Sequence, residues 1–273
     1  YEFFNFVGIF NLIPTKSALK KALRKEYITV DKYVATSATM IAGGESIELT
    51  IPHDANETKR LVFPLEVLME DDHLAIIHKP AGILVSGNSF KTVANALAQN
   101  LKRSQLSDAA APQPTHRLDY ATTGLLLVGK TGSCIRALNN MFENKKVKKS
   151  YLAISIGEMK NKGDITSAID GKSSLSSYSV MDNVKSERFG KLNLVELTPH
   201  TGRKHQLRKH LSEIGNPILG DQNYGIDGLT LKGKGLYLHA HTLKFTHPFT
   251  EEAVDIKSEI PTKFRKIFAS LSA

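Results

Sequence analysis

The sequence predicts an α+β protein built as two units, a small one at the N-terminus and a larger one that holds most of the chain. Short apolar runs of strand length are interspersed with amphipathic segments of helical period. A polar stretch without periodicity, 53–60, separates the first group of these segments from the rest. The 273 residues suffice for two cores of unequal size. We therefore divide the chain into a small unit at 1–57 and a large unit at 58–273.

The composition is that of an ordinary globular protein with a basic excess. Hydrophobic residues make up 41% and charged residues 23%, and the net charge is +9. A positive charge of this size favours a polyanionic partner, most often nucleic acid, although a merely basic soluble protein has the same balance. Cys134 is the single cysteine, so no internal disulfide forms, which fits a reducing, cytoplasmic location. No run reaches the roughly 20 apolar residues of a membrane span, so we expect no membrane partner.

The N-terminal unit is expected to combine a basic helix with short strands. The apolar opening segment 1–14 contains Glu2 in place of a basic leader, and we interpret it as a packing segment rather than a signal peptide. Segment 17–26 has an apolar stripe of alanine and leucine with lysine and arginine opposite, which predicts a helix. Strands are predicted at 28–30 and 47–49. The basic helix is either an RNA-binding surface or a solvated face.

The first part of the large unit predicts a strand, a tight turn and a helix. The apolar run 74–77 indicates a buried strand. The Lys-Pro-Ala-Gly sequence at 79–82 indicates a turn, since proline fixes one backbone dihedral angle and glycine permits a positive one. Segment 92–101 has helical periodicity, and 104–114 is interpreted as a loop.

The stretch 115–131, THRLDYATTGLLLVGKT, is the most informative of the chain. Its small hydroxylated residues and Gly124 favour a tight backbone path, and the following run is continuously apolar, as in a strand covered on both faces. Asp119 is therefore expected on a loop that a rigid core strand supports, a common place for a working carboxylate. The alternative is that Asp119 is only a turn residue and Arg117 a surface charge.

The following segments predict a helix and more strands. A helix is expected at 133–144, followed by a lysine cluster at 145–149. A strand at 151–156 begins with Tyr151. The serine-rich part 163–190 predicts short strands and exposed turns.

A second informative stretch, HTGRKHQLRKHLSEIGNPILGDQNY at 200–224, follows a predicted strand at 192–197. We predict a helix from Thr201 to Ile214, with Gly215 just after its end. Six basic side chains crowd its first turns, where they oppose the helix macrodipole, which suggests that they serve a partner. The alternative is a solvated basic face.

Segment 236–245 alternates, which puts Tyr237, His239 and His241 on one face of a strand. Two histidines at this spacing are able to ligate a metal, but no cysteine or carboxylate joins them at a usual spacing. We therefore expect sheet-face histidines and no metal site. A short helix led by Pro261 closes the chain.

Five stretches, in their order along the chain, resemble the RluA-type family of RNA pseudouridine synthases. The specific part is the HRLD quartet at 116–119 together with TGRKHQLR and GNPILGD. Residues 15–50 partly resemble an S-four-type RNA-binding domain, which pairs a basic helix with a small sheet. The five stretches are EDDHLAIIHKPAG, HRLDYATTGLLLVGKT, KKSYLAISIGE, LTPHTGRKHQLRKHLSEIGNPILGDQNYG and LHAHTLKFTHPF.

The resemblance implies a fold and a reaction. The fold is a curved, mixed and largely antiparallel sheet flanked by helices, preceded by the small α+β unit. The reaction isomerises specific uridines in structured RNA, ribosomal or transfer, to pseudouridine on a flipped-out nucleotide. The base is detached from C1′ of the ribose, rotated and rejoined through C5. The resemblance implies no metal or organic cofactor, and we expect a monomer whose partner is RNA.

The resemblance also assigns site residues. Asp119 matches the essential carboxylate, which attacks the ribose or the uracil, or assists glycal formation. Arg208 matches the arginine that pairs with it, and an enclosed carboxylate does need a cationic, hydrogen-bonding partner. Tyr151 matches the tyrosine that stacks on the target base. The residues expected to bind the substrate are His116, Arg117, Arg203, His205 and Leu207.

Two other functions remain open on the sequence. A retaining glycosidase also places a carboxylate beside an anomeric carbon, but it needs a second carboxylate about 5 Å away, for which only Asp221 is a candidate. A non-catalytic RNA-binding protein of the same fold is the other alternative. The intact set of Asp119, Tyr151 and Arg208 argues against it.

Overall fold

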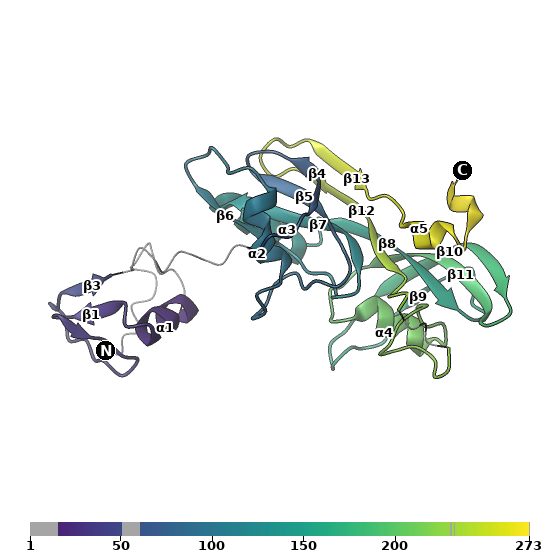
Figure 1. The fold of residues 1–273 in the computed structure, drawn as a ribbon, viewed down its shortest axis with the longest axis horizontal. Coiled ribbons are helices and arrows are strands. Elements are labelled where there is room, and N and C mark those ends of the chain that lie inside the picture. Colours follow the sequence, from purple (N-terminus) through teal and green to yellow (C-terminus); the bar gives the residue numbers. More distant parts are fainter. Residues whose placement is uncertain (1–15, 51–60, 230, 232, 273) are drawn as a thin grey trace. The chain divides into compact units, whose positions relative to one another are not determined.

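The computed structural model describes residues 16–50, 61–229, 231 and 233–272. The chain divides into two compact units, 1–60 and 61–273 (Figure 1). Each unit has a hydrophobic core of its own. The expected packing segment 1–14, the linker 53–60 and the predicted boundary between residues 57 and 58 lie outside the described residues.

The N-terminal unit packs one helix on a three-stranded antiparallel sheet of order β2-β1-β3. Leu19 and Leu23 of the helix are buried in one cluster with Ile28 and Val30 of the central strand. The apolar stripe seen in the sequence is therefore the face that packs, and the predicted helix and two strands are confirmed. The elements are α1 (Lys16–Arg24), β1 (Ile28–Val30), β2 (Tyr33–Val34) and β3 (Ile47–Leu49).

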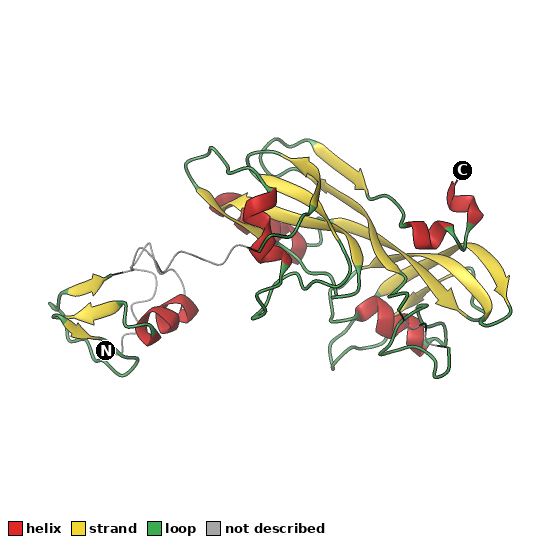
Figure 2. Ribbon diagram, viewed as in Figure 1, coloured by secondary structure: helices red, strands yellow, loops and turns green. Residues whose placement is uncertain are grey.

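The large unit is organised on a ten-stranded sheet that twists strongly along its length (Figure 2). Its strands are β4 (Glu66–Glu70), β5 (Leu74–Lys79), β6 (Ala109–Pro114), β7 (Thr123–Thr131), β8 (Lys148–Ile156), β9 (Lys162–Ile165), β10 (Ser176–Ser186), β11 (Gly190–Pro199), β12 (Leu238–Thr246) and β13 (Ala253–Lys257). The order is β4-β5-β7-β12-β8-β11-β10-β9, with β13 paired to β12 and β6 to β7. The expected mixed, largely antiparallel sheet is confirmed.

The one parallel pairing among the described strands joins β7 to β12 over two residue pairs. Thr123 lies opposite His239, and Gly124 opposite Ala240. At this short seam the β4-β5-β7 half of the sheet meets the half that runs from β12 to β9. A side chain at position 124 would overlap the backbone of Ala240, and the φ angle there is +111°, so only glycine permits this close approach.

Strand β7 is covered on both faces, as its apolar run predicts. Leu126 and Val128 pack in a cluster with helix α2, whereas Leu125 and Leu127 pack in another with helix α3. Both of these predicted helices are confirmed. No helix among the described residues is long and apolar enough to cross a membrane. The helices of the large unit are α2 (Val93–Asn100), α3 (Gly132–Glu143), α4 (Gln206–Glu213) and α5 (Thr262–Arg265), and a 3₁₀ turn follows at Ala269–Ser272.

Two segments are more regular than the sequence indicates. Residues 109–114, interpreted as part of a loop, form strand β6 beside β7. Its prolines fit because an edge strand does not need every N–H for pairing. Strand β10 runs unbroken through eleven residues of the serine-rich part, where short strands and turns were expected. Only alternate residues such as Val180 and Val184 reach the core, which is why its apolar content is low.

The expected clean alternation along 236–245 is interrupted. In the pairing of β12 with β8 the register shifts between Ala240 and Thr242, so the run does not keep one set of residues on one face. His239 and His241 lie with ring centroids 6.1 Å apart. Within the described residues, no group of three or more His, Cys, Asp or Glu side chains is arranged to hold a metal ion.

His239 makes a testable contribution to acid sensitivity. It is fully buried, and its Nδ1 lies 2.8 Å from the Thr123 hydroxyl. Burial, followed by the nearby His78 and His241, lowers its pKa to about 3. Between about pH 6.5 and 3 the unfolded chain therefore binds a proton that the folded protein does not, and stability falls as the pH falls.

We expect this residue to add about 1.4 kcal/mol per pH unit to the slope of unfolding free energy in that window. Urea unfolding between pH 4 and 8 should show a shallower slope for His239→Asn than for the wild type. The comparison at pH 8, where the histidine is neutral in both states, gives the pH-independent cost of the substitution. Equal slopes in the two proteins would contradict the assignment.

Candidate active site

Asp119 lies on the loop that joins β6 to β7. The backbone N–H of Thr122 donates to the carbonyl oxygen of Asp119 at 3.1 Å, which closes the tight turn expected from the small hydroxylated residues. The strand that follows is buried on both faces. Asp119 is thus held immediately beside the seam between β7 and β12, and its side chain is 21% exposed.

Lys79, the first residue of the predicted 79–82 turn, is buried and binds this loop. The ammonium group of Lys79 donates to the carbonyl oxygens of Pro80, Tyr120 and Thr122 at 3.0, 3.3 and 2.8 Å. Burial lowers its pKa to about 8, and the negative charge of Asp119 opposes this shift. Lys79 therefore ties the Asp119 loop to the end of β5.

Arg208 of helix α4 connects two carboxylates. Its Nε and Nη2 donate to Asp221 at 2.7 and 2.8 Å, and its remaining nitrogen, Nη1, donates to Asp119 at 3.3 Å. The Asp221 side chain is fully buried and that of Arg208 is 8% exposed. The predicted pair of Arg208 and Asp119 is therefore present, but the closer, bidentate partner of the guanidinium is Asp221.

The backbone also holds Asp221 in place. The N–H groups of Asn223 and Tyr224 donate to its Oδ1 at 3.0 and 3.1 Å. Burial works against the ionised form, but the hydrogen bonds and charge of Arg208 outweigh it and lower the pKa of Asp221. Sequence spacing gives no sign of this role, and the sequence presents Asp221 only as a candidate second carboxylate of a glycosidase.

His205 stands at the start of α4 in a left-handed backbone conformation, with φ of +56°. Its Nε2 is 3.8 Å from Asp119 Oδ1, and its Nδ1 is 2.9 Å from the hydroxyl of Tyr224. Burial lowers the pKa of His205, and the Asp119 carboxylate opposes that shift. A strained backbone that turns an imidazole toward a carboxylate is typical of a functional position.

The helix begins later than the sequence predicts. Helix α4 starts at Gln206, so Thr201 and Arg203 belong to the preceding loop. The Gln206 side chain fixes that loop, because its Oε1 accepts from the Thr201 hydroxyl at 2.7 Å and from the Arg203 N–H at 3.0 Å. The cations at 203 and 204 consequently precede the helix and do not occupy its first turn.

Tyr151 lies within β8, paired with Leu197 of β11 and Ala240 of β12. The residue is buried, with an exposed fraction of 8%. Burial, and then the Asp119 carboxylate, raise the pKa of the phenol, so the hydroxyl keeps its proton at neutral pH. The strand therefore presents a neutral aromatic ring to the same cavity as Asp119.

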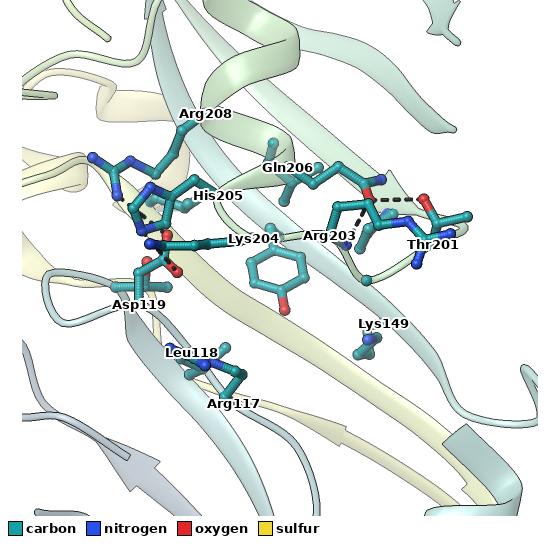
Figure 3. Close-up of a pocket in the computed structure, with 16 residues that line it drawn as sticks. Arg117, Leu118, Asp119, Lys149, Thr201, Arg203, Lys204, His205, Gln206 and Arg208 are labelled. Carbon is teal, nitrogen blue, oxygen red and sulfur yellow. Dashed lines mark hydrogen bonds and ion pairs between the residues drawn. The ribbon is translucent and has the colours of Figure 1, made fainter. Parts of the chain in front are cut away.

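These side chains surround a cleft of about 260 Å³ (Figure 3). His116 is the predicted site residue that does not line it. Its Nε2 accepts from the Leu127 N–H at 3.0 Å, and it faces a neighbouring groove. The predicted site residues that the structure brings together around the cleft are Arg117, Asp119, Tyr151, Arg203, His205, Leu207 and Arg208.

The cleft has the features that chemistry on a nucleotide requires. One carboxylate faces the cavity beside a flat aromatic ring, and basic side chains surround the opening. Such a site is able to place a base on the ring, to bring a sugar carbon to the carboxylate and to bind phosphates at its rim. A mixed sheet that carries this constellation at its central seam defines an enzyme that acts on nucleic acid.

The chain belongs to the RNA pseudouridylate synthases, because the model of that family matches residues 73–213. It is of the RluA type. Ribosomal large subunit pseudouridine synthase D of Nitrosomonas europaea is 32% identical over 92% of this chain and 79% of its own length. Ribosomal large subunit pseudouridine synthase C of Vibrio vulnificus is 32% identical over 94% of this chain and 88% of its own length.

Solved structures agree on the fold. Human RNA pseudouridylate synthase domain containing 4 superposes with a TM-score of 0.61 at 26% identity, over 76% of this chain and 93% of that one. Human RNA pseudouridylate synthase domain containing 1 has the same TM-score at 24% identity, over 75% of this chain and 86% of that one. The predicted family, fold class and RNA-modifying activity are therefore confirmed, and the glycosidase and non-catalytic alternatives are not.

Replacing Asp221 by Asn should affect both folding and turnover. The substitution removes one charge of a buried pair, which destabilises the protein by about 3 kcal/mol. It also frees the guanidinium of Arg208, and we expect kcat for pseudouridine formation to fall about 10- to 100-fold. Urea unfolding and tritium release from RNA labelled at C5 of uridine measure the two effects.

Glu158→Gln is the matched control. It also removes one carboxylate charge, but the ion pair that it breaks, with Lys191, lies at the surface and contributes little to stability. It should leave turnover unchanged. An Asp221→Asn protein with wild-type kcat would show that Arg208 needs no second carboxylate to serve the reaction.

Proposed function

We propose that this synthase converts a uridine of large-subunit ribosomal RNA to pseudouridine and that Asp119 is its essential carboxylate. The observation that carries the proposal is the position of Asp119 in the cleft, hydrogen-bonded by Arg208 and close to the buried ring of Tyr151. The ribosomal target follows the names of the relatives from Nitrosomonas europaea and Vibrio vulnificus.

The reaction is an isomerisation whose atoms balance without a second substrate. The bond between C1′ of the ribose and N1 of uracil breaks, the base rotates, and a bond from C1′ to C5 forms. The proton on C5 leaves, and N1 gains one. In the proposed mechanism Asp119 supplies the reacting carboxylate, Arg208 fixes its orientation, and Tyr151 stacks on the base near C5.

The target nucleotide must leave its stack to reach this cleft. Arg117 is exposed at the opening, where its flat guanidinium is suited to stack in place of the extruded base. Arg203 also lines the cleft and is suited to bind a phosphate, whereas His205, whose Nε2 is 3.8 Å from Asp119 Oδ1, is suited to hydrogen-bond the nucleotide beside the carboxylate. Leu207 contributes an apolar wall, and His116 extends the binding surface into the neighbouring groove.

The proposal extends to the whole chain. The protein acts as a cytoplasmic monomer, and its N-terminal unit adds RNA affinity through the basic face of α1, which carries Lys21 and Arg24 in its last turn. The separate core of that unit supports a role as an independent binding module.

Asp119→Asn should abolish the activity. The amide keeps the shape and a hydrogen-bond acceptor but lacks the charge, so turnover should fall below detection while RNA affinity changes less than about threefold. Tritium release from a C5-tritiated transcript of bacterial large-subunit ribosomal RNA measures turnover, and filter binding measures affinity. A fully active variant would refute the role of Asp119.

The same assay on the wild type tests the substrate. Release from ribosomal transcripts but not from transfer RNA is expected. Tritium release only from transfer RNA would show that the substrate is transfer RNA and not ribosomal RNA. Release from neither RNA would refute the proposed activity.

Deletion of residues 1–60 should weaken binding and leave the cleft intact. We expect KM for the ribosomal transcript to rise about tenfold or less, with kcat within about twofold, because the cleft residues all lie in the large unit. Unchanged affinity would exclude an RNA-binding role for the N-terminal unit. A point variant of the full chain, Lys21→Glu, should lower affinity in the same direction.

A further inference from the structure

A second cavity adjoins the reaction cleft. It is a groove of about 1000 Å³ along β8, β11 and β12, and it lies wholly within the large unit. The groove and the cleft share several lining residues, including Arg117, Lys149 and Arg203. Because a volume of this size is at the upper end for a small-molecule site, the groove has room for more than one nucleotide beyond the cleft.

The groove is strongly basic. Its two acidic side chains, Glu143 and Glu196, are outnumbered by seven basic ones. A concave surface with such an excess concentrates polyanions and follows a phosphate backbone well. The basic residues are Arg117, Lys145, Lys148, Lys149, Arg203, Lys244 and Lys257.

Lys149 stands at the junction of the two cavities. It precedes Tyr151 by two residues on β8, so both side chains leave the strand on the same face. It is only partly exposed, and among the described residues no carboxylate lies within ion-pair distance of its ammonium group. By contrast, Lys130 and Lys244 each have a carboxylate within 2.8 Å.

Aromatic side chains hold Lys149 in place. Its Nζ lies 5.3 Å from the ring centroid of Phe142, and the His116 ring packs on the same phenylalanine at 4.8 Å. Burial, followed by the charge of Lys149, lowers the pKa of His116 to about 3, so the imidazole beside the lysine is neutral. Burial also lowers the pKa of Lys149 itself.

A partly buried cation without an anion is costly, and binding an anion there recovers that cost. We propose that Lys149 binds the phosphodiester next to the target uridine, and that the groove holds the RNA strand that continues from it. The inference rests on the proposed function, since it takes the nucleotide in the cleft to be the target. In this proposal Lys149 is a positioning residue: it binds the RNA backbone, and the residues of the cleft carry out the reaction.

Lys149→Met is the informative variant, because methionine keeps the apolar stem on Phe142 and removes the charge. Its matched control is Lys102→Met, an exposed lysine that lines neither cavity. The probe is the C5-tritiated transcript of bacterial large-subunit ribosomal RNA, used for turnover and for binding at 50–300 mM KCl. Lys149→Arg tests rescue by a conserved charge.

For Lys149→Met we expect KM to rise about tenfold, as for the loss of one charged hydrogen bond, with kcat within about twofold. The slope of log affinity against log salt should become shallower by about 0.7, the value for one phosphate contact on a single strand. Lys149→Arg should restore the slope, and Lys102→Met should leave KM and slope unchanged. A Lys149→Met protein with the wild-type slope, or with a loss in kcat alone, would overturn the inference.

A melting curve shows whether Lys149→Met folds. If it does not, Lys145→Asn tests the same groove, since Lys145 is exposed in a left-handed conformation that asparagine tolerates. Its salt slope should also become shallower, and an unchanged slope would refute the groove. If the wild type releases no tritium, the proposed function is refuted. The salt slopes of the wild type and the variants are measured by binding alone, so they still decide this inference.

Discussion

The bidentate pair of Arg208 and Asp221 is the interaction on which the site depends. A guanidinium that bound Asp119 alone would be free to swing around that single contact. Because Asp221 is fully buried and fixed by two backbone N–H groups, it uses two of the guanidinium nitrogens and sets the direction of the third. The Asp119 carboxylate therefore meets a donor whose position is determined by the protein interior.

Two other side chains near Asp119 are also fixed by contacts within the protein. Lys79 holds the carbonyl groups of the loop rather than the carboxylate, and His205 approaches the other carboxylate oxygen from a strained backbone position. Each of these side chains is fixed by a contact within the protein, Lys79 by the loop carbonyl groups and His205 by the Tyr224 hydroxyl. The cleft is thus organised before RNA arrives, which favours reaction over mere binding.

Sequence patterns predict the features of the structure that depend on residues close together in the chain. The double-sided burial of β7 and the loop position of Asp119 follow from an apolar run behind small hydroxylated residues. Motif likeness adds Tyr151 and Arg208. The role of Asp221 depends on its contact with Arg208, 13 residues earlier in the chain. The burial of Lys79 depends on contacts with residues at least 41 positions away. The identity of either residue alone does not predict these contacts. Strand β10 is missed for a related reason, since one face packs and the other consists of polar side chains.

The seam between β7 and β12 gives the site a mechanical property. Asp119 belongs to the half of the sheet that contains β7, whereas Tyr151 and Arg208 belong to the half beyond β12. Two residue pairs form the backbone connection between these halves. The distance between the Asp119 carboxylate and Arg208 therefore depends on how the two halves of the sheet are positioned relative to each other, and the hydrophobic core that both halves share holds that position.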